Sequence, residues 1–449
     1  MAPCPCGSGK RFKSCHGASS DSNPSLIKPS NKDLHLRALA QQQAGNLAAA
    51  IVLHRQVLAT DPDDAITQHY LGLALMDLER PELVEEAFAL LDTALEKMPE
   101  EPEFHNNMAT VYINRGEYEA AIGSADMTLS LSPAHARAHC NKALALQEMG
   151  AHTEALALFE RAVKLEPRLV LAQWNESLSL LALGRYQQGF ALFEKRYQLP
   201  GYTGRTVFPN IERWDGVPIP GRKLTIIAEQ GLGESLQYMR FAPYYADLGL
   251  EITLVVPETL KELTRTLDAR ITVVADNSLL LKFDGWTGMM SLPYHRKLSE
   301  KNVGSAAYLS VPADSVANMR AALLADSKHV TGNKLVGLCY AGNTQKQARR
   351  FDRFLFAEQL AVLAQMPGIT WVSLQKGEAV TEAMFTQHFP QGISKTLNTL
   401  WDTAVLASSC DAVVSIDTVI AHLAGALGLH THLLLHTPAE WRWCLGDSP

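Results

Sequence analysis

Proline recurs at a nearly constant interval along the first half of this 449-residue chain. Pro99, Pro133 and Pro167 are each 34 residues apart, and Pro200 follows after 33 residues. Pro62 precedes Pro99 by 37 residues, which indicates a three-residue insertion in the second unit. Because proline ends a helix, the constant interval predicts one repeating supersecondary unit stacked several times.

Glycines keep the same interval, at Gly116, Gly150 and Gly184. The stretch GEYEAAIGSADMTLSLSP aligns with GAHTEALALFERAVKLEP and GRYQQGFALFEKRYQLP, so each unit consists of a helix, a glycine-containing turn, a second helix and a proline. This layout matches the tetratricopeptide repeat (TPR), and we expect about four full repeats over residues 31–200 with partial ones at the ends. Stacked repeats bury their apolar faces and leave a concave surface, so we expect this region to bind a protein.

Asparagines also follow the 34-residue interval on the first helix of successive units, at Asn107, Asn141 and Asn175. An amide side chain donates and accepts hydrogen bonds, so it can hold a peptide backbone of any sequence. The three resemble the asparagine ladder of eukaryotic O-GlcNAc transferase, where such residues hold an extended acceptor peptide. Asparagine is also common at this position in repeats that bind no extended peptide, and both interpretations stay open.

The N-terminus carries Cys4, Cys6, Cys15 and His16, around a Gly-Ser-Gly turn. Three thiolates and an imidazole suit tetrahedral Zn²⁺, and four protein ligands make a closed structural site. The alternative is a flexible tail whose cysteines occur by chance. The stretch PCPCGSGKRFKSCHG resembles the SEC-C zinc motif, which implies a zinc-dependent docking module over residues 1–17 and no catalytic zinc. Residues 18–30 are interpreted as a linker.

Charge and the distribution of apolar residues argue against several classes of protein. The chain has 40 basic and 47 acidic residues, a net charge of −7, which argues against a dedicated nucleic-acid binder. No apolar run reaches the roughly 18 residues that a membrane span needs. The N-terminus lacks the apolar core of a signal peptide, so we expect a cytoplasmic protein.

From about residue 222 the pattern changes to short apolar runs separated by helix-like segments. Such alternation predicts parallel sheets covered by helices, and the runs form two groups on either side of residues 310–333. We therefore expect one Rossmann-like domain over residues 201–330 and another over 331–449, facing each other across a cleft at the carboxyl ends of their strands. The expected strands are 224–229, 251–256, 271–276, 335–340, 369–375, 411–417 and 432–436.

The expected strand 224–229 runs directly into Gly231, Gly233 and Glu234. The two glycines permit a close backbone approach, and a helix that starts about Glu234 favours negative charge nearby. A carboxylate at the mouth of the cleft is suited to take a proton from an acceptor hydroxyl. Its alternative role is to stabilise the start of the helix through the helix dipole.

A second motif, CYAGNTQKQARRFDRF, follows the expected strand 335–340. Its Gly-Asn turn at Asn343 precedes a dense basic cluster that includes Arg350 and Arg353. Guanidinium groups pair with phosphates through two parallel hydrogen bonds, so the cluster suits a diphosphate. The alternative is a solvated loop.

A third motif, SIDTVIAHLAGALG, follows the expected strand 411–417. Asp417 ends the strand, Thr418 opens a helix and His422 lies one turn in. Amides at the helix start, with the Thr418 hydroxyl, can bind a phosphate. Asp417 as an ordinary N-cap and His422 as a half-buried structural residue remain the alternatives.

Together, RWDGVPIPGRKLTIIAEQGLGESLQYMRFAP, GLCYAGN, WVSLQKG and DAVVSIDTVIAHLAGALG resemble bacterial TPR proteins with a glycosyltransferase domain related to family 9 heptosyltransferases. The resemblance covers roughly residues 31–447. It implies an α + α/β chain in which a TPR superhelix precedes a GT-B pair of Rossmann-like domains. It further implies transfer of a sugar from a nucleotide-sugar donor without a catalytic metal.

The resemblance assigns roles to particular residues. Glu234 takes the place of an aspartate that serves as general base, and the donor phosphates meet Asp417, Thr418 and His422. The base or ribose lies near Gln375 and Lys376. Asn343, Arg350 and Arg353 complete the expected donor site. The resemblance does not decide which of the two arginines corresponds to the arginine of the family.

The acceptor implied by the resemblance is a protein held by the repeats, of which flagellin is one candidate. GT-B enzymes often return their last helix to the first domain, so we expect this chain either to be shortened at its C-terminus or to lack that brace. The alternative function is a non-catalytic TPR scaffold with a degenerate transferase domain.

Overall fold

A computed structural model describes residues 29–202, 212–275, 283–304, 306–342, 354–376 and 379–443. The expected zinc motif over residues 1–17 and nearly all of the linker lie outside them. The chain divides into two compact units, Met1–Met108 and Ala109–Pro449, and the division falls inside helix α6.

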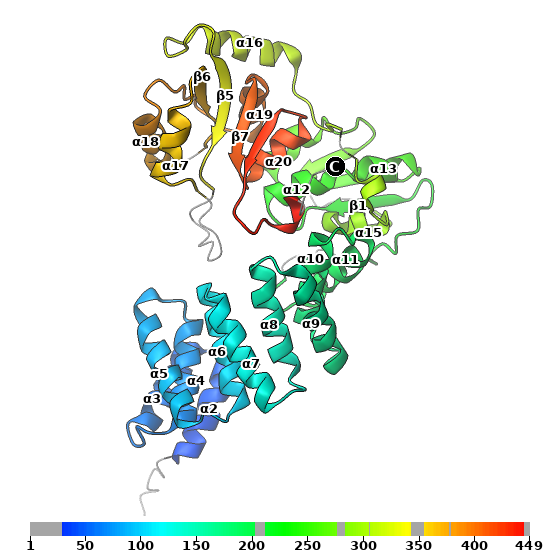
Figure 1. Cartoon of the computed structure of the whole chain (residues 1–449). Coiled ribbons are helices and arrows are strands. Elements are labelled where there is room, and N and C mark those ends of the chain that lie inside the picture. Colours follow the sequence, from blue (N-terminus) through cyan, green and yellow to red (C-terminus); the bar gives the residue numbers. More distant parts are fainter. Residues whose placement is uncertain are drawn as a thin grey trace, which may run out of the picture. The chain divides into compact units, whose positions relative to one another are not determined.

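Residues 29–202 form consecutive helices joined by short turns (Figure 1). Antiparallel neighbours pack in pairs, as the 34-residue interval predicts. The tetratricopeptide prediction is therefore confirmed at the level of the fold. The helices are α2 (Asn31–Gln43), α3 (Leu47–Leu58), α4 (Ala65–Asp77), α5 (Val84–Lys97), α6 (Pro102–Arg115), α7 (Tyr118–Leu131), α8 (Ala136–Glu148), α9 (His152–Leu165), α10 (Val170–Ala182) and α11 (Tyr186–Phe193).

The turn inside each pair requires a left-handed residue. Gly116, Gly150 and Gly184 have φ values of +78°, +83° and +72°, which glycine adopts without a Cβ clash. The second pair has Glu79 in this place, with φ of +56°. The three-residue 3₁₀ turn Pro81–Leu83 follows it and accommodates the insertion that the sequence indicates.

The α/β half contains two four-stranded parallel sheets, which confirms the predicted fold class at this level (Figure 1). The first has the order β3-β2-β1-β4 and the second β6-β5-β7-β8. Every strand expected from the sequence is present, and each bound agrees with the expected one within two residues. The strands are β1 (Lys223–Ile227), β2 (Glu251–Val256), β3 (Thr272–Ala275), β4 (Gly285–Gly288), β5 (Lys334–Cys339), β6 (Ile369–Ser373), β7 (Ala412–Ile416) and β8 (Thr431–Leu434).

The sequence analysis missed strand β4, whose sequence is GWTG. Glycine is rare inside strands, so the segment lacks the pattern that predicts one. In the structure β4 pairs with β1 and all four of its residues are buried. A Cβ on Gly288 would lie 2.1 Å from Glu229 Oε2, so packing against that carboxylate requires glycine here.

Helices connect the strands and cover the sheets. One hydrophobic core joins buried residues of both sheets to Phe190 and Phe193 of α11. The last repeat is thus packed into the α/β core. The connecting helices are α12 (Leu232–Met239), α13 (Ala242–Asp247), α14 (Glu258–Thr264), α15 (Leu292–His295), α16 (Ala313–Leu324), α17 (Ala357–Ala364), α18 (Ala379–His388), α19 (Leu400–Ser408) and α20 (Val419–Ala426). None of the helices in the described ranges is long and apolar enough to cross a membrane.

The left-handed Glu79 yields a stability prediction. Replacing Glu79 by glycine removes the strain of a side chain at positive φ and should raise the free energy of unfolding of α4 and α5 by about 0.5–1 kcal/mol. Hydrogen-exchange protection of these helices in the full chain measures the change. The matched control is Gly45→Ala, where φ is +78° and nothing lies within 4 Å of the added Cβ. That variant should lose protection; an unchanged or lower protection in Glu79→Gly would contradict the argument.

Candidate functional site

The two sheets send corresponding loops toward each other. Strand β1 leads through Gly231 into α12, and β7 leads through Thr418 into α20. Helices α12 and α20 pack together so closely that a Cβ on Gly233 would lie 2.8 Å from His422 Cδ2. Gly233, in the helix after the first sheet, therefore lies directly against His422, in the helix after the second sheet.

Glu234 lies in the first turn of α12, at the junction with α20. Its side chain is 27% exposed, and Oε1 lies 3.5 Å from Arg442 Nη2. A Cβ on Gly231 would lie 2.7 Å from Glu234 Oε2, so the carboxylate folds back over the start of its own helix. The arrangement keeps the carboxylate partly accessible and close to one buried guanidinium.

The C-terminal segment forms the rest of this junction. Trp443 stacks on His422 with ring centroids 4.8 Å apart, and Trp441 packs edge-on against Phe190 with centroids 6.0 Å apart. Burial opposes the charge of Arg442, but Glu440 and other neighbours raise its pKa above the ordinary value, so it stays charged. The segment thus reaches Phe190 of α11 and Glu234 of α12, contacts that the sequence analysis did not expect.

Thr418 is the N-cap of α20, as the sequence predicts for a residue that opens a helix. Its hydroxyl accepts a hydrogen bond from the Ile420 amide at 3.3 Å and lies 3.4 Å from Cys339 Sγ. The hydroxyl therefore has partners within the protein. Asp417, which precedes it, is half-buried and lines a cavity of about 250 Å³.

Gln375 follows β6 and connects the ends of two strands. Its Nε2 donates to the Ala341 carbonyl oxygen at 2.9 Å, and its Oε1 accepts from the Ala341 amide at 3.2 Å. Lys376 Nζ donates to the Asn398 carbonyl oxygen at 2.5 Å. Both residues line a polar cavity of about 230 Å³, together with Glu382. The structure thus places the two residues together, and it gives the Gln375 amide a backbone partner.

Several of the predicted site residues lie outside the described ranges. These are the donor-site residues Asn343, Arg350 and Arg353, and the zinc ligands Cys4, Cys6, Cys15 and His16.

The three asparagines of the predicted ladder occupy the first helix of consecutive pairs. Asn107 is half-buried, with Nδ2 3.0 Å from His69 Nε2. Asn141 is also half-buried and donates from Nδ2 to Thr110 Oγ1 at 3.1 Å. Asn175 is only 6% exposed. The peptide ladder stays a prediction, and Asn175 has the least room for it.

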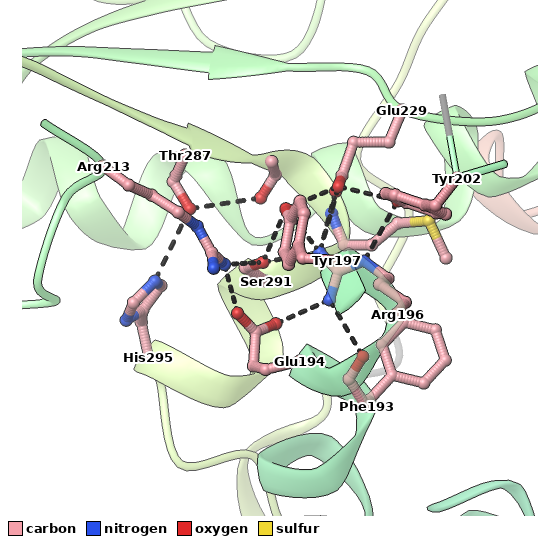
Figure 2. Close-up of polar contacts among 12 residues, drawn as sticks. Phe193, Glu194, Arg196, Tyr197, Tyr202, Arg213, Glu229, Thr287, Ser291 and His295 are labelled. Atoms are coloured by element: carbon pink, nitrogen blue, oxygen red, sulfur yellow. Dashed lines mark hydrogen bonds and ion pairs between the residues drawn. The ribbon is translucent and has the colours of Figure 1, made fainter. Parts of the chain in front are cut away.

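The sequence analysis missed a buried ionic network between the last repeat and β1, which Figure 2 shows. At its centre the Glu229 carboxylate, 3% exposed, accepts hydrogen bonds from Arg196 Nη2 at 3.0 Å and Tyr197 Oη at 2.5 Å. Tyr202 Oη also donates to this carboxylate, at 2.8 Å, and the Met290 amide donates to it at 3.0 Å. Four donors thus satisfy one buried carboxylate.

Arg196 is fully buried and has further partners in Figure 2. It donates to Glu194 Oε1 and to Ser291 Oγ, each at 2.6 Å. Burial disfavours its charge, but the neighbouring Glu229 raises the pKa of the guanidinium, so the arginine stays ionised. Arg213 pairs with Glu194 and lies over the Tyr197 ring, 3.9 Å from its centroid.

A sequence signal for this network existed. Glu229 directly precedes the Gly231 loop at the end of an apolar strand, where a buried carboxylate requires a cation. The burial of Arg196 could not be predicted, because this residue lies in a segment with the pattern of a repeat helix, where a charged side chain usually faces solvent. The network fixes the loop that carries Gly231 and Glu234 to the last repeat.

Comparisons with known proteins support two of the sequence predictions, the tetratricopeptide repeat and the SEC-C motif. The SEC-C motif model matches residues 2–18, and the tetratricopeptide repeat model matches residues 136–169, which contain α8 and α9. No curated protein matches the chain.

Solved structures resemble part of the chain. A MamA protein is 21% identical over 37% of this chain and 88% of its own, with a TM-score of 0.31. A Pseudomonas aeruginosa pilF structure is 21% identical over 39% of this chain and 78% of its own, with a TM-score of 0.34. A TPR protein of Thermus thermophilus is 18% identical over 39% and 93%, with a TM-score of 0.35.

Removal of Glu229 should be strongly destabilising. In Glu229→Ala the charge of Arg196 remains buried without its main partner, which costs about 3–5 kcal/mol of unfolding free energy. Urea unfolding of the full chain measures the loss. The matched control is Glu258→Ala, because Glu258 pairs with Lys261 on the surface of α14 and is 65% exposed. Equal and small losses in the two variants would show that the network does not hold this junction.

Proposed function

We propose that the chain is a metal-independent glycosyltransferase of the GT-B type that moves a sugar from a nucleotide-sugar donor to a protein bound by its repeats. The repeats themselves are of a kind that binds proteins. One observation carries the proposal: helix α12, which follows β1 and carries the partly exposed Glu234, packs against α20, which follows β7. Ligands of open α/β sheets bind at such strand ends.

Glu234 is the proposed general base. In the proposed step an acceptor hydroxyl attacks the anomeric carbon of the sugar, and the bond from that carbon to the diphosphate breaks. The hydroxyl proton passes to the Glu234 carboxylate, and the nucleoside diphosphate leaves with the bonding electron pair. Arg442 Nη2 lies 3.5 Å from Glu234 Oε1 and pairs with the proposed base.

The proposed donor site spans the second sheet. The start of α20 presents the positive end of its helix dipole to a phosphate, and Asp417, Thr418 and His422 surround that start. The polar cavity of Gln375 and Lys376, about 230 Å³, is the proposed place of the base or ribose. The Gln375 amide uses its oxygen and one N–H on Ala341, whereas the Lys376 ammonium uses one of its three donors on Asn398, so Lys376 is the better candidate for a direct contact. Arg350 and Arg353 remain proposed partners of the diphosphate.

The N-terminal motif supplies a second proposed contact. Cys4, Cys6, Cys15 and His16 are the ligand types that a structural zinc ion prefers, and the SEC-C model matches residues 2–18. We assign this zinc a docking role rather than a catalytic one.

A non-catalytic scaffold is the second candidate, and one observation favours it. Glu234, Gln375 and Thr418 all have partners within the protein, so the described part of the proposed site is satisfied without a ligand. A scaffold requires only the protein-binding repeats.

Glu234→Gln tests the proposed base. The variant should bind the donor as the parent does and lose turnover by a factor of about 10²–10⁴, because an amide cannot accept the proton. Turnover is measured as release of nucleoside diphosphate from the nucleotide sugar that stabilises the protein most in a thermal-shift panel. Glu258→Gln is the matched control, since Glu258 is also a first-turn glutamate and lies on the surface.

Two outcomes would contradict the proposal. Full turnover in Glu234→Gln would exclude this residue as the base. A panel of UDP, GDP, ADP, dTDP and CMP compounds without any stabilisation would favour the scaffold, because a ligand at 100 times its dissociation constant stabilises a fold by about 2.7 kcal/mol.

A further inference from the structure

Three histidines gather in the first compact unit, on successive helices of the repeats. His35 lies on α2, His54 on α3 and His69 on α4. Each of the three rings contacts Tyr70, with ring centroids 5.6, 6.4 and 5.5 Å from that of the tyrosine. We name these four residues the histidine cluster. Within the described residues, no group of three or more histidine, cysteine or acidic side chains could hold a metal ion.

His54 occupies a position of the repeat where the other units have an apolar side chain. It lies eight residues before Pro62, the proline that closes its unit. The residues eight before the closing proline of the next three units are fully buried and apolar: Leu91, Ala125 and Phe159. His54 is equally buried, so it brings a titratable ring into the core of its unit.

The surroundings of His54 offer nothing to a charged ring. Neither of its nitrogens has a hydrogen-bond partner among the described residues. A protonated ring would therefore bury two unpaired N–H donors and a charge, which costs far more than burial of the neutral ring. Burial lowers the pKa of His54 to about 4, and the neighbouring His35 adds to the effect.

His69 is held in its neutral form by a specific contact. Asn107 Nδ2 donates to its Nε2 at 3.0 Å, and the ring, 1% exposed, stacks on Phe104 with centroids 3.9 Å apart. A proton on Nε2 would face the Asn107 donor, so charging the ring removes this contact. Burial lowers the pKa of His69 to about 4.

Asp64, the N-cap of α4, is the nearby carboxylate that favours charge on His35 and His54. It already accepts hydrogen bonds from two backbone amides of α4 and from the Thr67 hydroxyl. The pKa of His35, whose Nδ1 lies 3.3 Å from Thr67 Oγ1, is still lowered by burial. The carboxylate thus does not offset the burial of the rings.

Other charged groups of the neighbouring helices are engaged with partners of their own. On α2, Asp33 accepts from Ser30, and α3 and α5 are joined by an ion pair on their exposed sides. From α6, His105 Nε2 pairs with the Pro99 carbonyl oxygen at 2.7 Å. The remaining ion pairs of these helices are Arg55 with Glu86 and Lys97 with Asp63.

We propose that the histidine cluster makes helices α2–α5 an acid-sensitive switch, which opens when its rings take up protons and so dismantles the first part of the repeat surface. The switch is independent of the proposed function, because it needs neither a nucleotide sugar nor turnover.

The direction of the switch follows from proton linkage. An opened chain takes up these protons near the ordinary histidine pKa of about 6.5, whereas the folded His54 and His69 have a pKa of about 4. Between these values the opened state binds more protons, so the free energy of opening falls as the pH falls below about 6.5. Asp77, at the end of α4, acts in the opposite sense, because burial raises the pKa of its carboxyl.

Hydrogen exchange of the full chain at pH 7 and pH 5, corrected for the intrinsic pH dependence of exchange, tests the proposal. By linkage, His54 and His69 should each raise the opened fraction about 20-fold between these pH values. Amides of α3 and α4 should therefore lose protection by a factor of about 20 to 400 in the parent chain.

Two variants remove one titrating ring each and should lose about 20-fold less protection than the parent over the same pH step. His54→Leu places in this unit the side chain that Leu91 supplies in the next one. His69→Asn does the same with Asn106, which holds the equivalent position and is 3% exposed. Each variant is compared with itself at pH 7, so a change in its stability at neutral pH does not affect the result.

His105→Gln is the matched control, because it removes a buried histidine of the same unit that lies outside the cluster. Gln68 and Gln173 hold the equivalent position in other units, and each donates to the carbonyl oxygen of its own unit's proline. The control should therefore stay folded and keep the pH dependence of the parent.

Three results would overturn the proposal. They are protection of α3 and α4 that is equal at pH 7 and pH 5 in the parent, a loss in both cluster variants as large as that of the parent, and a loss reduced in His105→Gln as much as in the cluster variants.

Discussion

The buried pair of Arg196 and Glu229 is the interaction on which the candidate site depends. A fully buried guanidinium is tolerated only when a carboxylate and further hydrogen bonds replace its water. Here the guanidinium belongs to the last repeat, and the carboxylate belongs to the loop after β1. Because Glu229 lies two residues before Gly231, the pair also fixes the loop that leads to Glu234. The repeat array and the α/β half are thereby one packed unit from Ala109 onward.

A second constraint brings the two parallel sheets together. Helices α12 and α20 meet where Gly233 lies against His422, and no side chain larger than hydrogen fits at that glycine without displacing the imidazole. Trp443 covers the other part of the histidine ring. The helices that follow β1 and β7 consequently lie against each other, which a site shared by the two sheets requires.

Much of the fold was predictable because it depends on local periodicity. The 34-residue interval predicted the paired helices, and apolar runs predicted the strands, since both patterns reflect which face is buried. The strand at Gly285–Gly288 was not predictable, because Gly288 is required by its contact with Glu229, a residue distant in sequence. Glu79 occupies a position where the other repeats have glycine. Its positive φ was not predictable, because glutamate rarely adopts this conformation.

The candidate site was predictable in position and less so in detail. Glycines and a carboxylate after one strand, and Asp-Thr after another, indicated the ends of β1 and β7, and whether these form a site stays a prediction. The sequence did not reveal that Gln375 binds the backbone of Ala341, that Thr418 contacts Cys339, or that Arg442 approaches Glu234. Each of these contacts joins residues that are far apart along the chain, and only tertiary packing determines them.

Hydrogen exchange in the presence of the most stabilising nucleoside diphosphate tests most directly whether the ends of β1 and β7 form one ligand site. The account predicts increased protection of backbone amides at the start of α12, around Gly233, and at the start of α20, around Thr418, in the same experiment. Protection at only one of these starts, or at neither, would contradict it.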